Sequence, residues 1–233
     1  MTNLDPLNSS KQIFLKTCSN NNFDISESKQ HLLENYVSLL LSYNKKINLI
    51  SRVDEENIWT HHILHCTSLL FHKSFLPSCT ILDLGTGGGL PGIVFAILHP
   101  ELHFTLLDAT RKKIDAVRSM IDELHLENIK TVWGRAEEIA RQPEYSGKFD
   151  IVLARAVAPL DKLTKWAKPF LNPAPDVVTA STEFIPPRSL VAYKGGDIAD
   201  EINRVRKNKF IKDIERVILD PDDEKIAVIL QFK

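Results

Sequence analysis

The chain has 233 residues, of which 43% are hydrophobic and 25% charged, a composition typical of a globular protein and not of a disordered one. Its formal net charge of −1 gives no overall positive field, so any RNA contact must come from a local patch. The three cysteines lack metal-ligand spacing, the first ten residues lack the basic segment and apolar core of a leader peptide, and no apolar run approaches membrane-spanning length. We therefore expect free thiols, no membrane contact and a cytoplasmic protein.

The first part of the chain shows a helical pattern. A polar break over residues 43–52 favours a loop with solvated lysines, and a second helix is predicted over residues 54–71. His61 and His65 share a face of that helix, but no carboxylate stands nearby at ligand spacing. We predict no metal site, and interpret these histidines as surface or RNA-facing groups.

A glycine-rich stretch follows the first predicted strand, residues 80–84. Gly85, Gly87 and Gly89 let the backbone take positive φ and approach a ligand closely, and Pro91 opens the next helix. A strand, a glycine turn and a helix N-terminus together form a pocket floor whose free N–H groups face the ligand. The stretch therefore predicts a site for a nucleotide-like cofactor.

Two cofactors fit this glycine pattern. Three alternate glycines from Gly85 begin directly after the strand, with Asp83 two positions before them, as in Rossmann-like methyltransferases that bind S-adenosylmethionine (SAM). A second frame from Gly87 matches the dinucleotide fingerprint, but it starts two residues late and puts Pro91 inside the turn. The sequence thus favours SAM, with an NAD-dependent oxidoreductase as the alternative.

Two further strand ends supply candidate cofactor contacts. The predicted strand 103–108 ends in Asp108, whose carboxylate would accept two hydrogen bonds from a ribose diol. Capping of the next helix is the alternative role for this residue. After the predicted strand 129–133, Ala136 and Glu137 would present backbone and carboxylate groups to adenine.

Cations open the helix that follows the second strand. Arg111, Lys112 and Lys113 oppose the dipole of that helix, so their place beside the pocket indicates a phosphate or RNA contact, with a solvated face as the alternative. Lys46, Arg52 and His62 in the N-terminal part complete the set of residues predicted to bind RNA.

The fourth predicted strand, residues 149–154, leads to Arg155. No Asp/Asn-Pro-Pro-aromatic run follows it to hold an exocyclic amine, and no cysteine in this half of the chain could add to a pyrimidine. Guanine N7 needs neither device, because its lone pair can attack an activated methyl group directly. Arg155 would pair with the methionine carboxylate of SAM or grip guanine O6 and N7, and a salt bridge to Asp83 or Asp108 is its alternative role.

The last part of the chain completes a sheet. The proline-bearing segment 172–188 is predicted to be a mobile loop with few apolar anchors. The fifth strand, 189–193, ends at Lys194, which would lie at the ligand edge of the sheet. Two runs, 210–219 and 225–232, are expected to pair as an antiparallel hairpin.

The predicted fold class is α/β. We expect a Rossmann-like class I SAM-dependent methyltransferase, with a seven-stranded, mostly parallel sheet, a C-terminal antiparallel hairpin and an N-terminal helical extension. The expected domains are a helical arm over residues 1–76 and a SAM-binding domain over residues 77–233.

These motifs closely resemble one known family, the bacterial 16S rRNA guanine-N7 methyltransferase G family, also called glucose-inhibited division protein B. The resemblance runs from Tyr43 to about Gly196, and it rests jointly on Tyr43-Asn44-x-Lys46-x-Asn48-Leu49, His62-Ile63-Leu64, the glycine stretch from Asp83 to Gly92, Leu107-Asp108, Gly134-Arg135-Ala136-Glu137, Arg155-Ala156 and Lys194-Gly195. It implies SAM as methyl donor, 16S rRNA or the small ribosomal subunit as partner, and a guanine in the decoding-region loop as target. By similarity, loss of activity is linked to low-level streptomycin resistance.

The resemblance also indicates site residues. It matches cofactor contacts of the family to Gly85, Leu90, Ala136, Glu137 and Arg155. The glycine pattern and the strand ends add Asp83, Gly87, Gly89 and Asp108 as expected cofactor contacts, and Arg155 and Lys194 are the catalytic candidates. His65 and Cys66 stand where relatives usually have an acid and a serine. A non-catalytic SAM-binding module of ribosome assembly is therefore a second alternative. We expect the protein to be a monomer.

Overall fold

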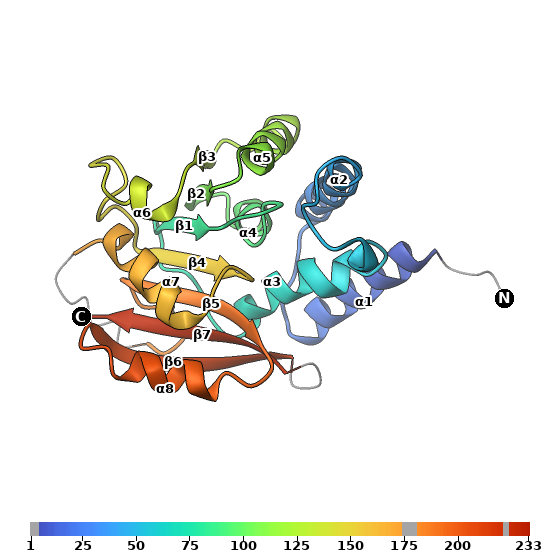
Figure 1. The fold of residues 1–233 in the computed structure, drawn as a ribbon. Helices are drawn as coiled ribbons and strands as arrows, with labels where there is room; N and C mark the ends of the chain where they lie inside the picture. The colour runs from blue at the N-terminus through green and yellow to red at the C-terminus, as the bar shows by residue number, and fades with distance from the viewer. Residues whose placement is uncertain (1–4, 174–180, 221–223) are drawn as a thin grey trace.

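The computed structural model describes residues 5–173, 181–220 and 224–233. At its centre is a seven-stranded sheet in the order β3-β2-β1-β4-β5-β7-β6, in which β1 to β5 are parallel and β7 is antiparallel to its neighbours β5 and β6 (Figure 1). This arrangement confirms the predicted fold class. The strands are β1 (Thr80–Leu84), β2 (His103–Asp108), β3 (Ile129–Trp133), β4 (Ile151–Arg155), β5 (Ser189–Gly195), β6 (Ile211–Asp220) and β7 (Lys225–Phe232).

Helices cover both faces of the sheet. Side chains that follow one another along a strand point to opposite faces, so Ile81 of β1 joins one hydrophobic cluster and Leu82 joins the other. Burial on both faces explains why the central strands are almost continuously apolar. The helices are α1 (Pro6–Asn20), α2 (Glu27–Asn44), α3 (His65–Thr67), α4 (Gly92–Leu98), α5 (Arg111–Glu123), α6 (Ala136–Ile139), α7 (Leu160–Ala167) and α8 (Ala199–Arg206).

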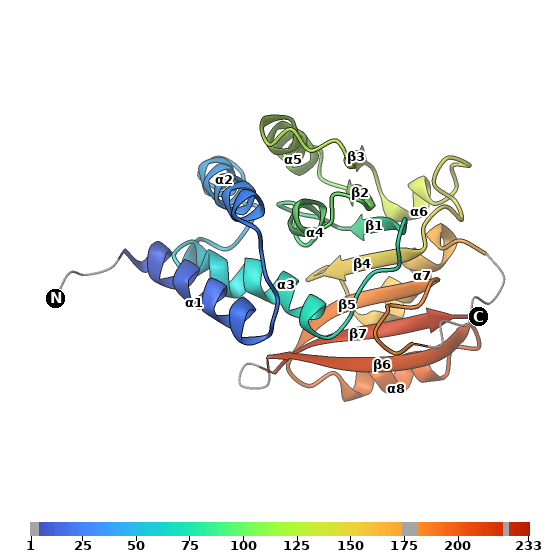
Figure 2. The ribbon, with the colours of Figure 1, turned by 180° about the vertical axis from the view of Figure 1, so that it is seen from behind.

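The N-terminal arm lies beyond the carboxyl ends of the parallel strands. Figures 1 and 2 show α1, α2 and α3 past the arrowheads of β1 and β4 from opposite sides. Buried arm residues such as Phe14, Tyr36 and Ile63 belong to the same hydrophobic cluster as Ile81 of the sheet. The arm and the sheet therefore share a core, and the arm covers the edge of the sheet where parallel α/β proteins bind ligands.

The predicted helix over residues 54–71 is wrong in detail. The chain makes a 3-10 turn at Arg52–Asp54, then π-helix over Trp59–Leu64, α-helix in α3 and 3-10 helix over Ser68–Phe71. The π-helical stretch places His62 and Ile63 inward while the neighbouring His61 faces solvent. Changes of helix type depend on packing, so apolar periodicity alone did not reveal them.

The segment 172–188 is also corrected where it is described. Ile185 is fully buried in the core, and Phe184 forms an isolated β-bridge with Ser74. The ammonium of Lys73 donates to the carbonyl of Thr182 at 2.6 Å. Residues 181–185 are therefore anchored rather than a mobile loop, and the part over 174–180 lies outside the described residues.

The C-terminal hairpin completes the sheet. β6 and β7 pair as predicted. The sequence predicts a turn over residues 220–223; Asp220 is the last residue of β6, and residues 221–223 lie outside the described residues. Of the helices in the described ranges, none has the length and hydropathy of a membrane span. Cys18, Cys66 and Cys79 are all buried free thiols.

Candidate active site

The glycine loop after β1 is held from below by Asp83. This side chain is fully buried, and its Oδ2 accepts hydrogen bonds from Thr86 Oγ1 at 2.6 Å and from the Gly92 amide at 2.9 Å. Burial raises the pKa of the Asp83 carboxyl to about 6. Asp83 does not line the cavity above the loop, so its predicted role as a cofactor contact is corrected: it fixes the shape of the loop.

Two glycines of the loop have different tasks. Gly85 has φ +75°, and a Cβ there would stand 2.7 Å from Val157 Cγ2, so only glycine fits between β1 and the end of β4. Gly89 lies beneath the loop, where a Cβ would stand 2.5 Å from Ile93 Cδ1. Gly89 is therefore a packing position and not, as predicted, part of the cofactor surface.

The ends of β1 to β4 converge on one cavity of about 470 Å³. Seven of the predicted cofactor residues contribute to its wall, namely Gly85, Gly87, Leu90, Asp108, Ala136, Glu137 and Arg155. Lys113, one of the three cations predicted to lie beside the pocket, is also on this wall, and sequence reasoning missed Leu49, Ile50, Ser51 and Trp166 there. We call this space the first cavity.

Asp108 occupies the floor of the first cavity and makes two local contacts. Its Oδ2 accepts from the Gly87 amide at 3.0 Å, and its Oδ1 accepts from the Thr110 amide at 2.7 Å. The second contact forms a turn just before α5, but the N-cap of α5 is Thr110 and no side chain caps it, so the alternative capping role of Asp108 is not supported. The carboxylate is fixed at the end of β2, where a ribose diol would meet it.

The arm closes the first cavity through Asn44. This side chain is 2% exposed; its Oδ1 accepts from the amides of Leu49 at 2.8 Å and Ile50 at 3.0 Å, and its Nδ2 donates to Glu55 Oε1 at 2.7 Å. The predicted solvated loop over residues 43–52 is therefore partly wrong, because a buried amide folds it over the cavity. The signal was present in the sequence as a short polar residue at the end of an apolar helix.

Arg155 ends β4 at the boundary of the first cavity. Its Nη2 donates to the His61 carbonyl at 3.1 Å and to His62 Nδ1 at 2.6 Å. Within the described part of the chain it makes no ion pair with Asp83 or Asp108, so the alternative structural role is not supported, and its buried Nε has no acceptor there. A buried donor without a partner is costly, so this N–H is available for a ligand.

His62 is buried and holds Arg155. The side chain is buried, and burial together with the nearby Arg155 charge lowers its pKa from 6.5 to about 4. Because Nδ1 accepts from Arg155, the hydrogen of the neutral ring is assigned to Nε2, which lies 3.7 Å from Asp54 Oδ2. In the structure His62 positions Arg155, and its contact with RNA stays a prediction.

A second cavity of about 730 Å³ adjoins the first. The two share His62, Arg155, Ala156 and Val157 as a common wall. Lys194 lines the second cavity as the strand pattern predicted, at the end of β5. Glu201 of α8 lies beside it and was missed, because nothing in the local sequence connects α8 with a ligand.

His65 lines the second cavity, and Cys66 is buried behind it. The ring of His65 packs edge-on against Tyr193 with centroids 5.3 Å apart, and the Cys66 carbonyl accepts from the Tyr193 hydroxyl at 2.9 Å. Burial raises the pKa of the Cys66 thiol to about 12, which excludes a thiolate nucleophile at neutral pH. Among the described residues, no three potential metal ligands come together.

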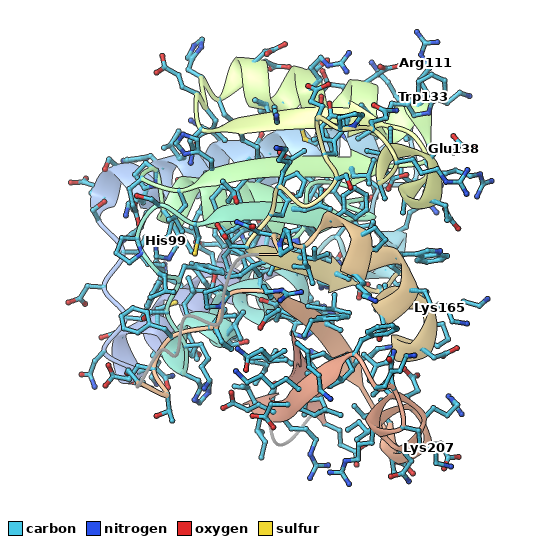
Figure 3. The ribbon with its side chains drawn as sticks, turned by 90° about the vertical axis from the view of Figure 1, so that its left-hand side faces the viewer. His99, Arg111, Trp133, Glu138, Lys165 and Lys207 are labelled. Atoms are coloured by element: carbon cyan, nitrogen blue, oxygen red, sulfur yellow. The ribbon has the colours of Figure 1, made fainter. Side chains whose placement is uncertain are left out.

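The other residues predicted to bind RNA lie on the surface. Lys46, Arg52, Arg111 and Lys112 are exposed, and none of the four lines either cavity. The guanidinium of Arg111 lies 5.2 Å from the ring centre of Trp133, beside it in Figure 3, and half of the Trp133 surface is exposed. Their contact with RNA stays a prediction.

A family comparison decides between the two cofactor interpretations. The sequence profile of rRNA small subunit methyltransferase G matches residues 29–222. The chain belongs to this family. Membership confirms the methyltransferase interpretation and leaves the NAD-dependent oxidoreductase without support.

Curated relatives agree with this assignment. Proteins named ribosomal RNA small subunit methyltransferase G are 40% identical over 197 residues in Chlorobium phaeobacteroides and 30% identical over 223 residues in Clostridium botulinum. These alignments cover 84% and 94% of this chain, and 80% and 88% of the relatives. The protein of the same name from Moorella thermoacetica is 33% identical, with 74% of this chain and 66% of that protein covered.

Solved structures agree on the fold. A SAM-dependent methyltransferase from Aquifex aeolicus superposes with a TM-score of 0.51 at 14% identity, covering 72% of this chain and 89% of that one. The fibrillarin/Nop5p complex gives a TM-score of 0.53 at 16% identity, with 74% and 82% covered. At such identities the likeness concerns the fold alone.

Proposed function

We propose that this chain transfers a methyl group from SAM to N7 of a guanine in the decoding-region loop of 16S rRNA. One observation carries the proposal: two cavities of different chemistry share a wall at Arg155. The first is floored by a glycine loop, and the second carries charged side chains. A donor and an acceptor of a methyl group could therefore occupy adjoining spaces.

The residues of the first cavity fit SAM. Asp108 would accept hydrogen bonds from the ribose, Ala136 and Glu137 would face the adenine, and the Gly85 and Gly87 region would contact the methionine part. The unpartnered Nε of Arg155 would suit the methionine carboxylate or the target base. When bound, SAM supplies an electrophilic methyl group on a positively charged sulfur.

The second cavity would orient the guanine. Guanine N7 already carries a lone pair, so the site needs no general base, and transfer makes the methyl–N7 bond as the methyl–sulfur bond breaks. Neutral His62 keeps Arg155 at the shared wall, and Lys194 holds a positive charge on the far wall. These residues would act by holding N7 in line with the methyl group.

We further infer that the protein works as a monomer in the cytoplasm, with exposed cations contacting the rRNA phosphates. The absence of a membrane-spanning helix in the described ranges and the three buried free thiols support this location. Lys46, Arg52, Arg111 and Lys112 are the proposed phosphate contacts.

Transfer of a tritiated methyl group tests the proposal. The protein is incubated with labelled SAM and small-subunit rRNA that lacks the modification, and the labelled nucleotide is then mapped. We expect label on N7 of one guanine in the decoding-region loop. Binding of S-adenosylhomocysteine without any transfer would instead support the non-catalytic assembly module, and label on another atom would reject the N7 assignment.

A further inference from the structure

The wall of the second cavity carries a fixed ion pair. Lys194 Nζ lies 2.9 Å from Glu201 Oε2, and only 14% and 22% of the two side chains are exposed. Each group has a further hydrogen bond, because Lys194 donates to the Ala158 carbonyl at 3.0 Å and Glu201 Oε2 accepts from the Leu160 amide at 2.8 Å. The pair is therefore held in one orientation.

Glu201 keeps one carboxylate oxygen for a ligand. Oε2 makes both of the bonds above, and Oε1 has no hydrogen-bond partner among the described residues. Burial acts to raise the pKa of Glu201, but the hydrogen bonds from Lys194 and the Leu160 amide outweigh it and hold the pKa below its ordinary value. An ionised carboxylate only accepts hydrogen bonds, so it selects a ligand edge that carries N–H groups.

The order of charges matches one edge of guanine. Along its Watson–Crick edge guanine presents the O6 acceptor and then the N1–H and N2–H donors. An ammonium followed by a carboxylate complements this order. Adenine carries the N6 amine in place of O6 and the N1 lone pair in place of N1–H. The ammonium would then face another donor, and the carboxylate would face another acceptor.

We propose that Glu201 accepts hydrogen bonds from N1–H and N2–H of the target guanine while Lys194 donates to O6. The inference rests on the proposed function and adds the residues that select the base. Reading of this edge leaves N7 free to face the shared wall at Arg155. Methylation of N7 puts a positive charge on the purine and strengthens N1–H as a donor, so the carboxylate would stabilise the transition state more than the ground state.

Substrates with and without the N2 amine test the proposal. Small-subunit rRNA carrying guanosine or inosine at the target is methylated by the wild-type protein, by Glu201→Gln and by Asp200→Asn. Inosine lacks only the N2 amine and keeps N7, O6 and N1–H. Asp200 is exposed, precedes Glu201 on α8 and undergoes the same change of charge, so it is the matched control.

We expect the wild-type protein and Asp200→Asn to prefer guanosine by about tenfold or more in kcat/KM, as the loss of a charge-assisted hydrogen bond predicts. Glu201→Gln should act on guanosine about tenfold more slowly, mainly in kcat, with its preference reduced to about twofold. Gln keeps an oxygen for the Leu160 amide, and thermal unfolding checks that the variant folds.

Two results would overturn the assignment. Equal wild-type rates on guanosine and inosine would show that the amine is not read, and this result needs no variant. An unchanged preference in Glu201→Gln would show that Glu201 only braces the start of α7. A wild-type protein that methylates neither rRNA would instead reject the proposed function itself.

Discussion

The two cavities are built in different ways from the same sheet. The first is formed mainly by short contiguous stretches at the ends of β1 to β4, to which the arm adds Leu49 to Ser51, and backbone groups of the glycine loop contribute to its floor. The second is formed by side chains that are far apart in sequence, such as Asp54, Arg155, Lys194 and Glu201. The cofactor side thus depends on local backbone shape, and the acceptor side depends on long-range placement of charge.

The two cavities should therefore respond differently to substitutions. Backbone donors cannot be removed by substitution, so changes in the first cavity act through loop shape or through its few side chains. In the second cavity one substitution removes a whole charged group, such as the mostly buried Lys194 or Glu201. Arg155 belongs to both cavities, and changes there should have the largest effect.

Arg155→Ala should lower methyl transfer about 100-fold, because charge-assisted hydrogen bonds of about 1.5–3 kcal/mol are lost from both sides of the shared wall. The labelled-methyl assay measures the rate, and circular dichroism checks the fold. Arg118→Ala is the control, since Arg118 is exposed on α5 and lines neither cavity. Near-normal turnover in Arg155→Ala would remove this residue from the site.

Asp108→Ala should affect the first cavity alone. We expect SAM binding to weaken by about 1–3 kcal/mol, because the carboxylate and its anchor on the Gly87 amide are both lost. Titration calorimetry with SAM measures the change, and exposed Asp115→Ala should leave the affinity unaltered. An unchanged affinity in Asp108→Ala would contradict the ribose role.

His62→Asn should change how stability depends on pH. The pKa of His62 is about 4 in the folded chain and 6.5 ordinarily, so as pH falls the unfolded chain binds this proton first. The contribution of neutral His62 to the free energy of unfolding is therefore complete above pH 6.5 and declines toward pH 4. Between pH 7 and pH 5 it falls by about 2 kcal/mol. Asparagine does not titrate and still offers Arg155 an acceptor.

Urea unfolding at pH 7 and pH 5 measures this effect. The variant should lose about 2 kcal/mol less than the wild-type protein over the interval. His31→Asn, at an exposed position of α2, should follow the wild-type curve. Parallel curves for His62→Asn and the wild-type protein would show that the buried ring is not held neutral.

Arg111→Ala should have the smallest effect, and only the binding of rRNA should change. The cation lies outside both cavities, so SAM binding should not change. If Arg111 contacts a phosphate, the affinity for rRNA should fall. The slope of the logarithm of the binding constant against the logarithm of the salt concentration should also decrease by about one. Filter binding over a range of salt measures this, with exposed Arg141→Ala as control. An unaltered slope would favour the solvated face.

Local pattern predicted the central strands well. β1, β2 and β3 have the predicted bounds, because short apolar runs between turn residues are recognisable without knowledge of their neighbours. The convergence of four strand ends followed from the parallel order, since such strands end at one edge of the sheet. The arm was less predictable, because its π and 3-10 segments arise where packing overrides ordinary helix geometry.

By itself the sequence determined the bounds of the first three strands, the glycine loop, the carboxylate at the end of β2 and the arginine at the end of β4, since these depend on neighbours along the chain. Only the tertiary structure decided which groups face a ligand. It buried Asp83 under the loop, turned His62 toward Arg155, and brought Glu201 beside Lys194. Contacts between distant segments are set by packing of the whole core, and that packing leaves no local signature in the residues that it brings together.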